Sequence, residues 1–137
     1  MYNMKYFTIK ELCYSKKAKE NNIYNEPTAV VADNLVLLVE NILDPLRQAY
    51  GKPIVVNSGY RSKSLNRLVG GVCNSQHLEG KAADIVGTPK TTEENKKLFE
   101  LIKKLNLPFC QLIDEKNMSW VHVSYDKNNI KKQILKL

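Results

Sequence analysis

Apolar side chains recur every three or four residues between Thr28 and Tyr50, and this pattern constrains the fold more than any other feature of the chain. The positions are Val31, Leu35, Leu38, Ile42, Leu46 and Ala49. Because an α-helix repeats every 3.6 residues, this spacing places them on one face of a long amphipathic helix. Pro45 lacks the amide that a helix interior needs, so we expect a kink or a division near Asp44.

The rest of the chain carries the signals of shorter elements. We expect a short helix opened by the capping box Thr8–Glu11, a strand at 54–57, a short helix at 64–69, a helix from the capping box Thr91–Glu94 to before Pro108, and strands at 109–113 and 118–124. The last two strands are close enough to form a hairpin. Helices come first and strands follow, mixed with a helix, so the order predicts an α+β fold with a small antiparallel sheet flanked by helices.

Length and composition set the broad class. The 137 residues fit one domain over residues 1–137, and 43% hydrophobic with 26% charged residues excludes wholesale disorder. No apolar run approaches about 18 residues, so we expect no membrane span. The first residues resemble no secretory signal, so we expect synthesis in the cytoplasm. Three scattered cysteines fit a reducing compartment better than a disulfide framework.

The formal net charge of +7 has two interpretations. It reflects either a solvated, lysine-rich surface or attraction to an anionic partner such as nucleic acid or bacterial cell wall. No arginine run and no basic–aromatic interleaving point to nucleic acid, so we expect no such partner. That alternative rests on charge alone, and steeply salt-dependent DNA binding would revive it.

The chain has only two histidines, His77 and His122. His77 lies seven residues before Asp84, and a turn at Gly80 between them can fold the carboxylate back beside the imidazole. Along residues 120–124, strand alternation places His122 on the face opposite its two neighbouring valines. The valines can face the core, so we expect His122 to point toward a cleft.

Two imidazoles and one carboxylate form a ligand set that suits zinc. Three protein ligands leave a fourth position open, which is the pattern of a catalytic site. One alternative is a pair of structural histidines with a surface aspartate, and spacing alone does not exclude it. Another is a closed structural site, completed by Cys73 four residues before His77.

Two motifs give the chain a family resemblance. The pattern SxHxxGxAxD at Ser75–Asp84, followed by WVHVS at Trp120–Ser124, resembles zinc D-alanyl-D-alanine carboxypeptidases and related phage endolysins of the M15 peptidase group. The SGYRS element at 58–62 and the run Gln111–Ile113 ahead of an acidic residue match as well. The resemblance extends from about Phe7 to Ser124 and implies a Hedgehog/DD-peptidase-like α+β fold.

The resemblance also implies what the site does. It places one zinc ion on His77, Asp84 and His122, and it implies hydrolysis of peptide bonds in the stem peptides of bacterial peptidoglycan. Arg61 is the candidate for stabilising the oxyanion or holding a substrate carboxylate, because a guanidinium stays charged and offers forked donors. The candidates for substrate binding are Ser75 and, less strongly, Tyr60 and Gln111. Trp120 could support the substrate, but a tryptophan in a strand more often belongs to the core.

Peptide hydrolysis also needs a general base, and the candidates are Asp114 and Glu115. We prefer Glu115, because strand alternation from Gln111 puts residues 111, 113 and 115 on one face. This argument requires the strand to continue through residue 115. Some relatives carry the acid three residues before the last histidine, where this chain has Ser119.

The sequence therefore predicts a monomeric zinc metallopeptidase, either a D-Ala-D-Ala carboxypeptidase or an endolysin-type endopeptidase. We expect it to act on the cell wall after release by a route such as a holin pore, as a phage lysin does. The alternative is a zinc-stabilised module that binds cell wall or a protein without cutting it, because a fold alone does not determine function.

Overall fold

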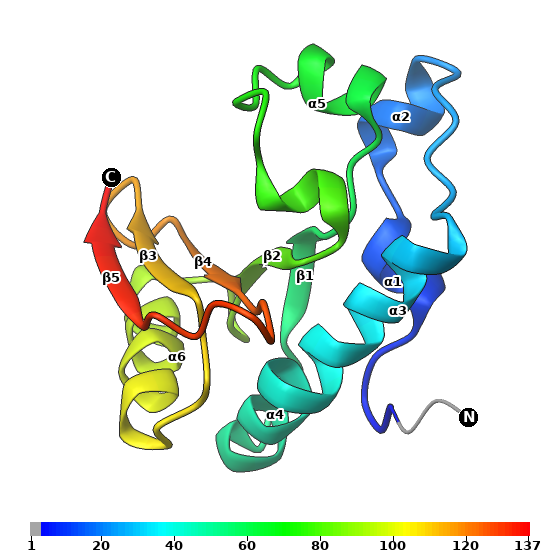
Figure 1. Cartoon of the computed structure of the whole chain (residues 1–137). Helices are drawn as coiled ribbons and strands as arrows, with labels where there is room; N and C mark the ends of the chain where they lie inside the picture. Colours follow the sequence, from blue (N-terminus) through cyan, green and yellow to red (C-terminus); the bar gives the residue numbers. More distant parts are fainter. Residues whose placement is uncertain (1–3) are drawn as a thin grey trace.

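A computed structural model describes residues 4–137 as a mixed α+β structure in which helices flank one sheet (Figure 1). The strands are β1 Val55–Ser58, β2 Ala82–Val86, β3 Gln111–Glu115, β4 Trp120–Ser124 and β5 Gln133–Lys136. The helices are α1 Ile9–Cys13, α2 Lys16–Glu20, α3 Ala29–Leu38, η1 Val39–Leu43, α4 Asp44–Tyr50, α5 Lys63–Leu68, η2 Gln76–Glu79 and α6 Thr92–Lys104. This confirms the α+β class. None of the helices in this part of the chain is long and apolar enough to cross a bilayer.

The long amphipathic segment is divided where proline requires it. Helix α3 continues into η1, a π-helical turn closed by a hydrogen bond from the amide of Asp44 to the carbonyl of Val39, and α4 then begins with Pro45 in its first turn. The wider π turn avoids the clash between a proline ring and the carbonyl four residues earlier. Most of the expected apolar face is buried, whereas Ala49 is exposed, so the expectation was wrong there.

The sheet order is β1-β2-β4-β3-β5. The first four strands pair antiparallel, and β3–β4 is the expected hairpin. Strand β5 was not expected, and it pairs parallel to β3, so the sheet is mixed rather than wholly antiparallel. It has four residues at the sheet edge, and most of them are exposed. A short, exposed edge strand shows little alternation of apolar and polar residues, so its sequence did not indicate a strand.

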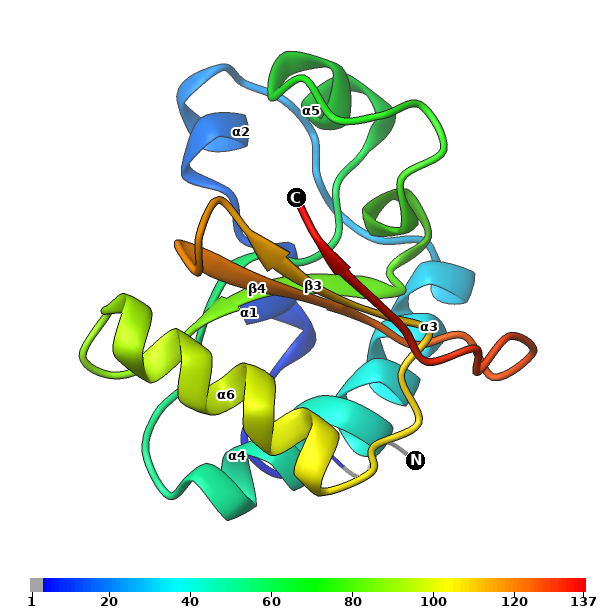
Figure 2. The same ribbon diagram turned by 90° about the vertical axis from the view of Figure 1, so that its left-hand side faces the viewer.

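The two faces of the sheet have different neighbours. Figure 2 shows α4 and α6 below the sheet, and α2 and α5 above it. The lower face carries the core, in which Ile85, Leu112, Val121 and Val123 are fully buried. Cross-strand pairing places Asp84 opposite His122, and strand alternation turns both away from that core. The register therefore brings these two polar side chains together on the upper face.

Candidate metal centre and active-site cleft

The imidazoles of His77 and His122 and the carboxylate of Asp84 converge on one point. Their ligand atoms all lie within 4.8 Å of one another. Asp84 Oδ1 is 3.3 Å from His77 Nε2 and 3.1 Å from His122 Nδ1. The structure thus brings together the three residues that the sequence marked as ligands.

Local structure explains how His77 reaches the sheet. It lies in the short helix η2, where the hydroxyl of Ser75 accepts a hydrogen bond from the His77 amide at 3.2 Å. Gly80 ends this helix with a φ of 73°, and a Cβ there would lie 2.8 Å from Val31. Glycine adopts this left-handed conformation without steric cost, so the chain can turn directly into β2 and Asp84.

The orientation of the His77 ring is set by backbone. Its Nδ1 lies 2.7 Å from the carbonyl oxygen of Gly59, and because a carbonyl only accepts, Nδ1 carries the proton and Nε2 presents its lone pair. The amide of Arg61 donates to the carbonyl of His77 at 3.0 Å. The amide of Tyr60 donates to the carbonyl of Leu12 at 2.8 Å, which fixes the same segment to α1. A hydrogen bond from the second ring nitrogen, such as the one from His77 Nδ1 to the Gly59 carbonyl, is typical of metal-binding histidines.

The three side chains fit a zinc ion. Tetrahedral zinc with ligands at 2.0–2.1 Å separates neighbouring ligand atoms by about 3.3 Å, close to the two distances from Asp84 Oδ1. Without a proton or cation between them, the lone pairs of these nitrogens and of the shared oxygen would repel. The second ring nitrogen of His122, Nε2, is buried, and no residue within 4–137 forms a hydrogen bond with it.

The carboxylate of Asp84 is held in its charged form. Burial alone would raise its pKa, but the two histidine side chains beside the carboxylate, His122 and His77, outweigh that effect and keep the pKa well below its usual range. Zinc binds carboxylates in their deprotonated form. Asp84 is therefore ready to act as a ligand at neutral pH.

Arg61 and Asp84 line the same cleft, which has a volume of about 640 Å³. Burial lowers the pKa of Arg61 from its usual value, and the charge of Asp84 opposes that shift. No residue within 4–137 forms a hydrogen bond with the buried Arg61 Nε. A half-buried guanidinium that lines the same cleft as a metal ligand can bind a substrate oxygen.

The candidate bases lie on different faces of β3. The strand continues through Glu115, as the alternation argument required, and Glu115 pairs with Trp120 while Ile113 pairs with His122. Cross-strand partners share a face, so Glu115 lies on the face of His122, two residues along the strand. Asp114 faces the other way, and its Oδ1 accepts a hydrogen bond from the amide of Met118 at 2.7 Å. The geometry favours Glu115, and its role stays a prediction.

The three residues expected to bind substrate have other contacts. Ser75 caps η2, as described above. Tyr60 is partly buried and packs against the hydrophobic core. The side-chain amide of Gln111 donates to Gln133 in β5 at 2.8 Å. None of the three lines the cleft of Arg61 and Asp84, so their substrate roles stay predictions.

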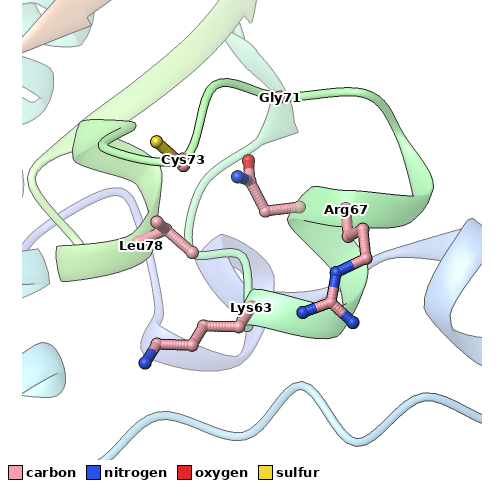
Figure 3. A pocket seen from close by; sticks show the side chains of 6 residues that line it. Lys63, Arg67, Gly71, Cys73 and Leu78 are labelled. Atoms are coloured by element: carbon pink, nitrogen blue, oxygen red, sulfur yellow. The ribbon is translucent and has the colours of Figure 1, made fainter.

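Cys73 does not close the metal site. The metal-ligand group found within residues 4–137 consists of three residues, and Cys73 is exposed. It lies across a separate pocket of about 330 Å³ from Lys63 and Arg67 (Figure 3). Gly71 borders this pocket, and a Cβ there would lie 2.9 Å from a guanidinium nitrogen of Arg61. The closed Cys-His-Asp-His alternative was therefore wrong.

The sequence did not indicate the role of Asn25, whose side chain forms hydrogen bonds with the SGYRS segment at 58–62. Its Nδ2 donates to the carbonyls of Cys13 at 2.8 Å and Tyr60 at 3.1 Å, and its Oδ1 accepts from the amide of Ser62 at 2.7 Å. A single asparagine in a polar loop gives no signal of these long-range contacts. Gly59, in contrast, could be identified from the sequence, because it lies inside the SGYRS motif at 58–62.

The sequence of this chain is similar to those of known peptidases. The family model described as Peptidase M15 matches residues 5–124. The zinc D-Ala-D-Ala carboxypeptidase of Streptomyces albus G is 52% identical over 44 residues, which are 31% of this chain and 17% of that protein. The chain thus spans about a sixth of the length of this curated relative. The crystal structure of an L-Ala D-Glu endopeptidase of Serratia marcescens matches with a TM-score of 0.42 and 22% identity, covering 57% of this chain and 68% of that one. Because the family model spans most of the sequence and both metal motifs, this chain belongs to the Peptidase M15 family.

Proposed function

We propose that this chain is a zinc-dependent peptidase that hydrolyses bonds in the stem peptides of bacterial peptidoglycan. The observation that carries the proposal is the convergence of His77, Asp84 and His122 beside a cleft that also contains Arg61. Three protein ligands would leave one coordination position of a zinc ion open, which is the pattern of catalytic rather than structural sites. The names of the two similar proteins, a carboxypeptidase and an endopeptidase, support a peptide substrate that contains D-amino acids.

The chain's own residues divide the remaining work. His77, Asp84 and His122 would hold a zinc ion, which would supply the Lewis acidity that polarises a carbonyl and lowers the pKa of a water molecule. Glu115 takes the proton from the attacking water and delivers it to the leaving amine. Arg61 stabilises the negative charge that develops on the carbonyl oxygen, because a guanidinium stays charged throughout. Ser75, Tyr60 and Gln111 are proposed to orient the peptide from the loops around the site.

The test uses defined muropeptides and mass spectrometry. Purified protein with zinc should release fragments whose masses identify the bond that is cut, either the terminal D-Ala-D-Ala bond or an internal one. Chelation and His122→Ala should each abolish release. Activity that persists after full chelation would contradict the proposal. Zinc binding without cleavage of any stem peptide would favour the binding-module alternative.

We also propose an endolysin-type setting for this activity, in which the protein reaches the wall on release from the cell where it is made. The family resemblance and the net charge of +7 support this, because peptidoglycan is anionic. Added to purified walls, the protein should lower their turbidity in a zinc-dependent way. Cleavage of free stem peptides with no effect on intact walls would contradict the endolysin setting alone.

A further inference from the structure

The cleft of the candidate metal centre is rimmed by lysines that the peptidase mechanism does not use. Besides Asp84 and Arg61, its lining includes Lys16 and Lys17 from the start of α2 and Lys90 from the loop between β2 and α6. These segments are separated by more than 70 residues in the chain and both line this cleft. The lining therefore holds four cationic side chains against one carboxylate, and that carboxylate belongs to the metal centre.

The three lysines are free to bind a ligand. All are exposed, and none forms an ion pair or side-chain hydrogen bond with another residue in the part of the chain that the structure describes. Other lysines are paired, among them Lys52 and Lys97 with Glu94, and Lys81 with Asp126. The positive potential at the cleft is thus not neutralised by neighbouring acids, which favours an anionic ligand.

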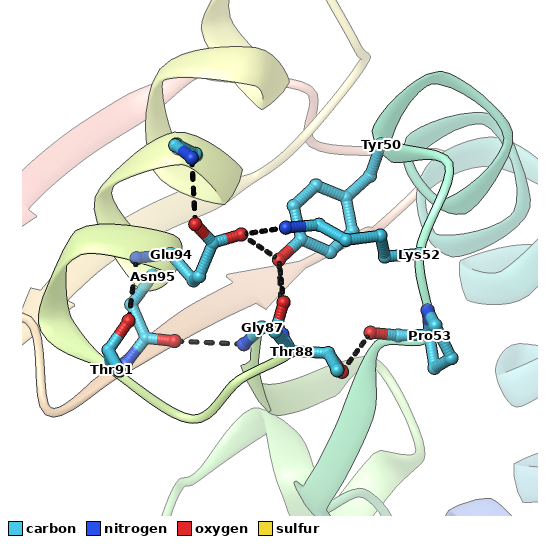
Figure 4. A network of polar contacts seen from close by, with 9 residues as sticks. Tyr50, Lys52, Pro53, Gly87, Thr88, Thr91, Glu94 and Asn95 are labelled. Carbon is cyan, nitrogen blue, oxygen red and sulfur yellow. Dashed lines mark hydrogen bonds and ion pairs between the residues drawn. The ribbon is translucent and has the colours of Figure 1, made fainter.

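Lys90 is presented by a loop that is fixed at both ends (Figure 4). On one side, the amide of Gly87 donates to Asn95 Oδ1 at 2.9 Å, and the amide of Thr88 donates to the hydroxyl of Tyr50 at 3.0 Å. On the other side, Thr91 caps α6. A loop that is fixed at both ends loses little backbone entropy when Lys90 binds a ligand, and the site from which this exposed side chain extends is set in advance.

Glu94 anchors this loop from the first turn of α6. Its carboxylate accepts hydrogen bonds from the hydroxyl of Tyr50 at 2.6 Å and from Lys97 at 2.7 Å, and it also contacts Lys52 (Figure 4). The Tyr50 hydroxyl thus connects Glu94 to the Thr88 amide. Lys52 and Lys97 neutralise Glu94, and Lys90 has no charged partner among the described residues.

Lys16 and Lys17 are also held by local structure. The hydroxyl of Ser15 caps α2 by accepting from the amide of Ala18 at 3.1 Å, and the side chain of Ala18 is buried. Tyr14, which precedes the cap, lines the same cleft with its largely exposed ring. The start of α2 therefore offers two cations beside an aromatic surface.

We infer that Lys16, Lys17 and Lys90 form an anion subsite that binds a carboxylate of the substrate, apart from the carbonyl oxygen that Arg61 contacts. The inference rests on the proposed function and narrows its substrate class to peptides with a free carboxylate near the scissile bond. A carboxamide at this position keeps the shape but loses the charge. The enzyme should therefore prefer the acid over the amide.

The test compares two synthetic stem peptides that differ only in a free α-carboxylate or carboxamide at the glutamate position. For the zinc-loaded protein, kcat/KM should be about tenfold higher for the acid, as expected for two or three partly screened charge pairs. Lys90→Gln and Lys16→Gln/Lys17→Gln should each lower the acid-to-amide ratio by two- to fivefold, and the triple variant should bring it near one. Lys104 is the matched control, because it is exposed at the C-terminal end of α6, outside the cleft lining, and forms no ion pair with another described residue; Lys104→Gln should keep the ratio. Circular dichroism of each variant shows that it is folded.

A binding measurement separates this inference from the proposed function. With chelator present, titration of both peptides into the protein by NMR should show tighter binding of the acid, and the triple variant should lose that preference. If the protein cleaves neither peptide but still prefers the acid, the proposed function is wrong and the subsite stands. An equal affinity and kcat/KM for both peptides, or a loss of preference in Lys104→Gln as large as in the triple variant, would overturn the subsite.

Discussion

Gly59 and His77 are joined by a hydrogen bond from the imidazole Nδ1 to the backbone carbonyl, at 2.7 Å. The partner atom belongs to backbone, so no side-chain substitution at residue 59 removes the acceptor itself. Glycine is needed here for lack of space, because a Cβ at residue 59 would lie closer to the carbonyl oxygen of Leu12 than van der Waals contact allows. The close approach of α1 to this loop therefore fixes the direction in which His77 presents Nε2.

The first prediction follows from this close approach. Gly59→Ala should shift the 58–62 segment, misalign His77 and lower zinc affinity by about 10- to 100-fold, the usual effect of losing an outer-shell contact. Competition with a chromogenic chelator measures the affinity. Gly70→Ala is the control, because a Cβ there would meet no described atom within 4 Å; its φ of +76° strains an alanine, so this variant should lose some stability but keep the parent's zinc affinity. A Gly59→Ala protein with the parent's zinc affinity would show that the carbonyl of residue 59 does not orient the ligand.

The orientations of the candidate metal ligands were predictable from local rules, because strand alternation turned His122 away from the core and a glycine turn returned Asp84 toward His77. Their convergence did not follow from local rules, because Asp84 and His122 lie 38 residues apart and meet through the pairing of β2 with β4, and the sequence indicated it only through the family motifs. Asn25 and β5 were not predictable, because their partners are distant and no motif marks them. Asn25 contacts residues 35 and 37 positions away, and β5 pairs with a strand 22 residues earlier. Local periodicity carries no information about such pairings.

A second prediction concerns Asn25. Asn25→Ala removes three hydrogen bonds in a partly buried loop and should lower the free energy of unfolding by about 1–3 kcal/mol, because the carbonyl of Tyr60 and the amide of Ser62 lose their partner. Urea denaturation measures this change. Asn21→Ala is the control, since Asn21 makes one side-chain bond at an exposed helix end and should cost less than about 0.5 kcal/mol. Equal effects of the two substitutions would show that Asn25 does not brace the site.

Zinc should stabilise the folded protein through the three ligands. At a free zinc concentration of 100 times Kd, the folded state gains about 2.7 kcal/mol, which raises Tm by several degrees. Asp84→Asn and His122→Ala should lose this shift in thermal denaturation. Cys73→Ser should keep it, because Cys73 lies outside the metal-ligand group. A shift that disappears in Cys73→Ser would restore a four-ligand structural site.

The Glu94 network predicts a specific dependence of stability on acid. Hydrogen bonds from Lys52, Lys97 and Tyr50 lower the pKa of Glu94 from 4.5 to about 2. A carboxylate with a lowered pKa stabilises the folded state above its unfolded pKa, and this contribution is lost as the pH falls from about 4.5 to about 2. Tm recorded across that window should therefore fall less steeply in Glu94→Gln than in the parent, although the parent is more stable at neutral pH. Glu93→Gln, an exposed neighbour, should keep the parent's slope, and equal slopes in all three proteins would exclude the network as the cause.

Substitution of Asp114 and of Glu115, the two acids at the end of β3, should affect different properties, stability in one case and catalysis in the other. Glu115 shares the face of His122, so Glu115→Gln should lower kcat by about 10²- to 10⁴-fold, the usual effect of losing a general base, with little change in Tm. Asp114 accepts the Met118 amide in the hairpin turn, so Asp114→Asn should lower Tm and leave kcat within a few-fold of the parent. Steady-state kinetics on one stem peptide and thermal denaturation of the same samples distinguish the two roles. The reverse pattern would assign the base to Asp114. Unchanged kcat in both variants would mean that neither carboxylate moves the proton. A zinc-stabilised binding module would then be the better explanation of what this protein does.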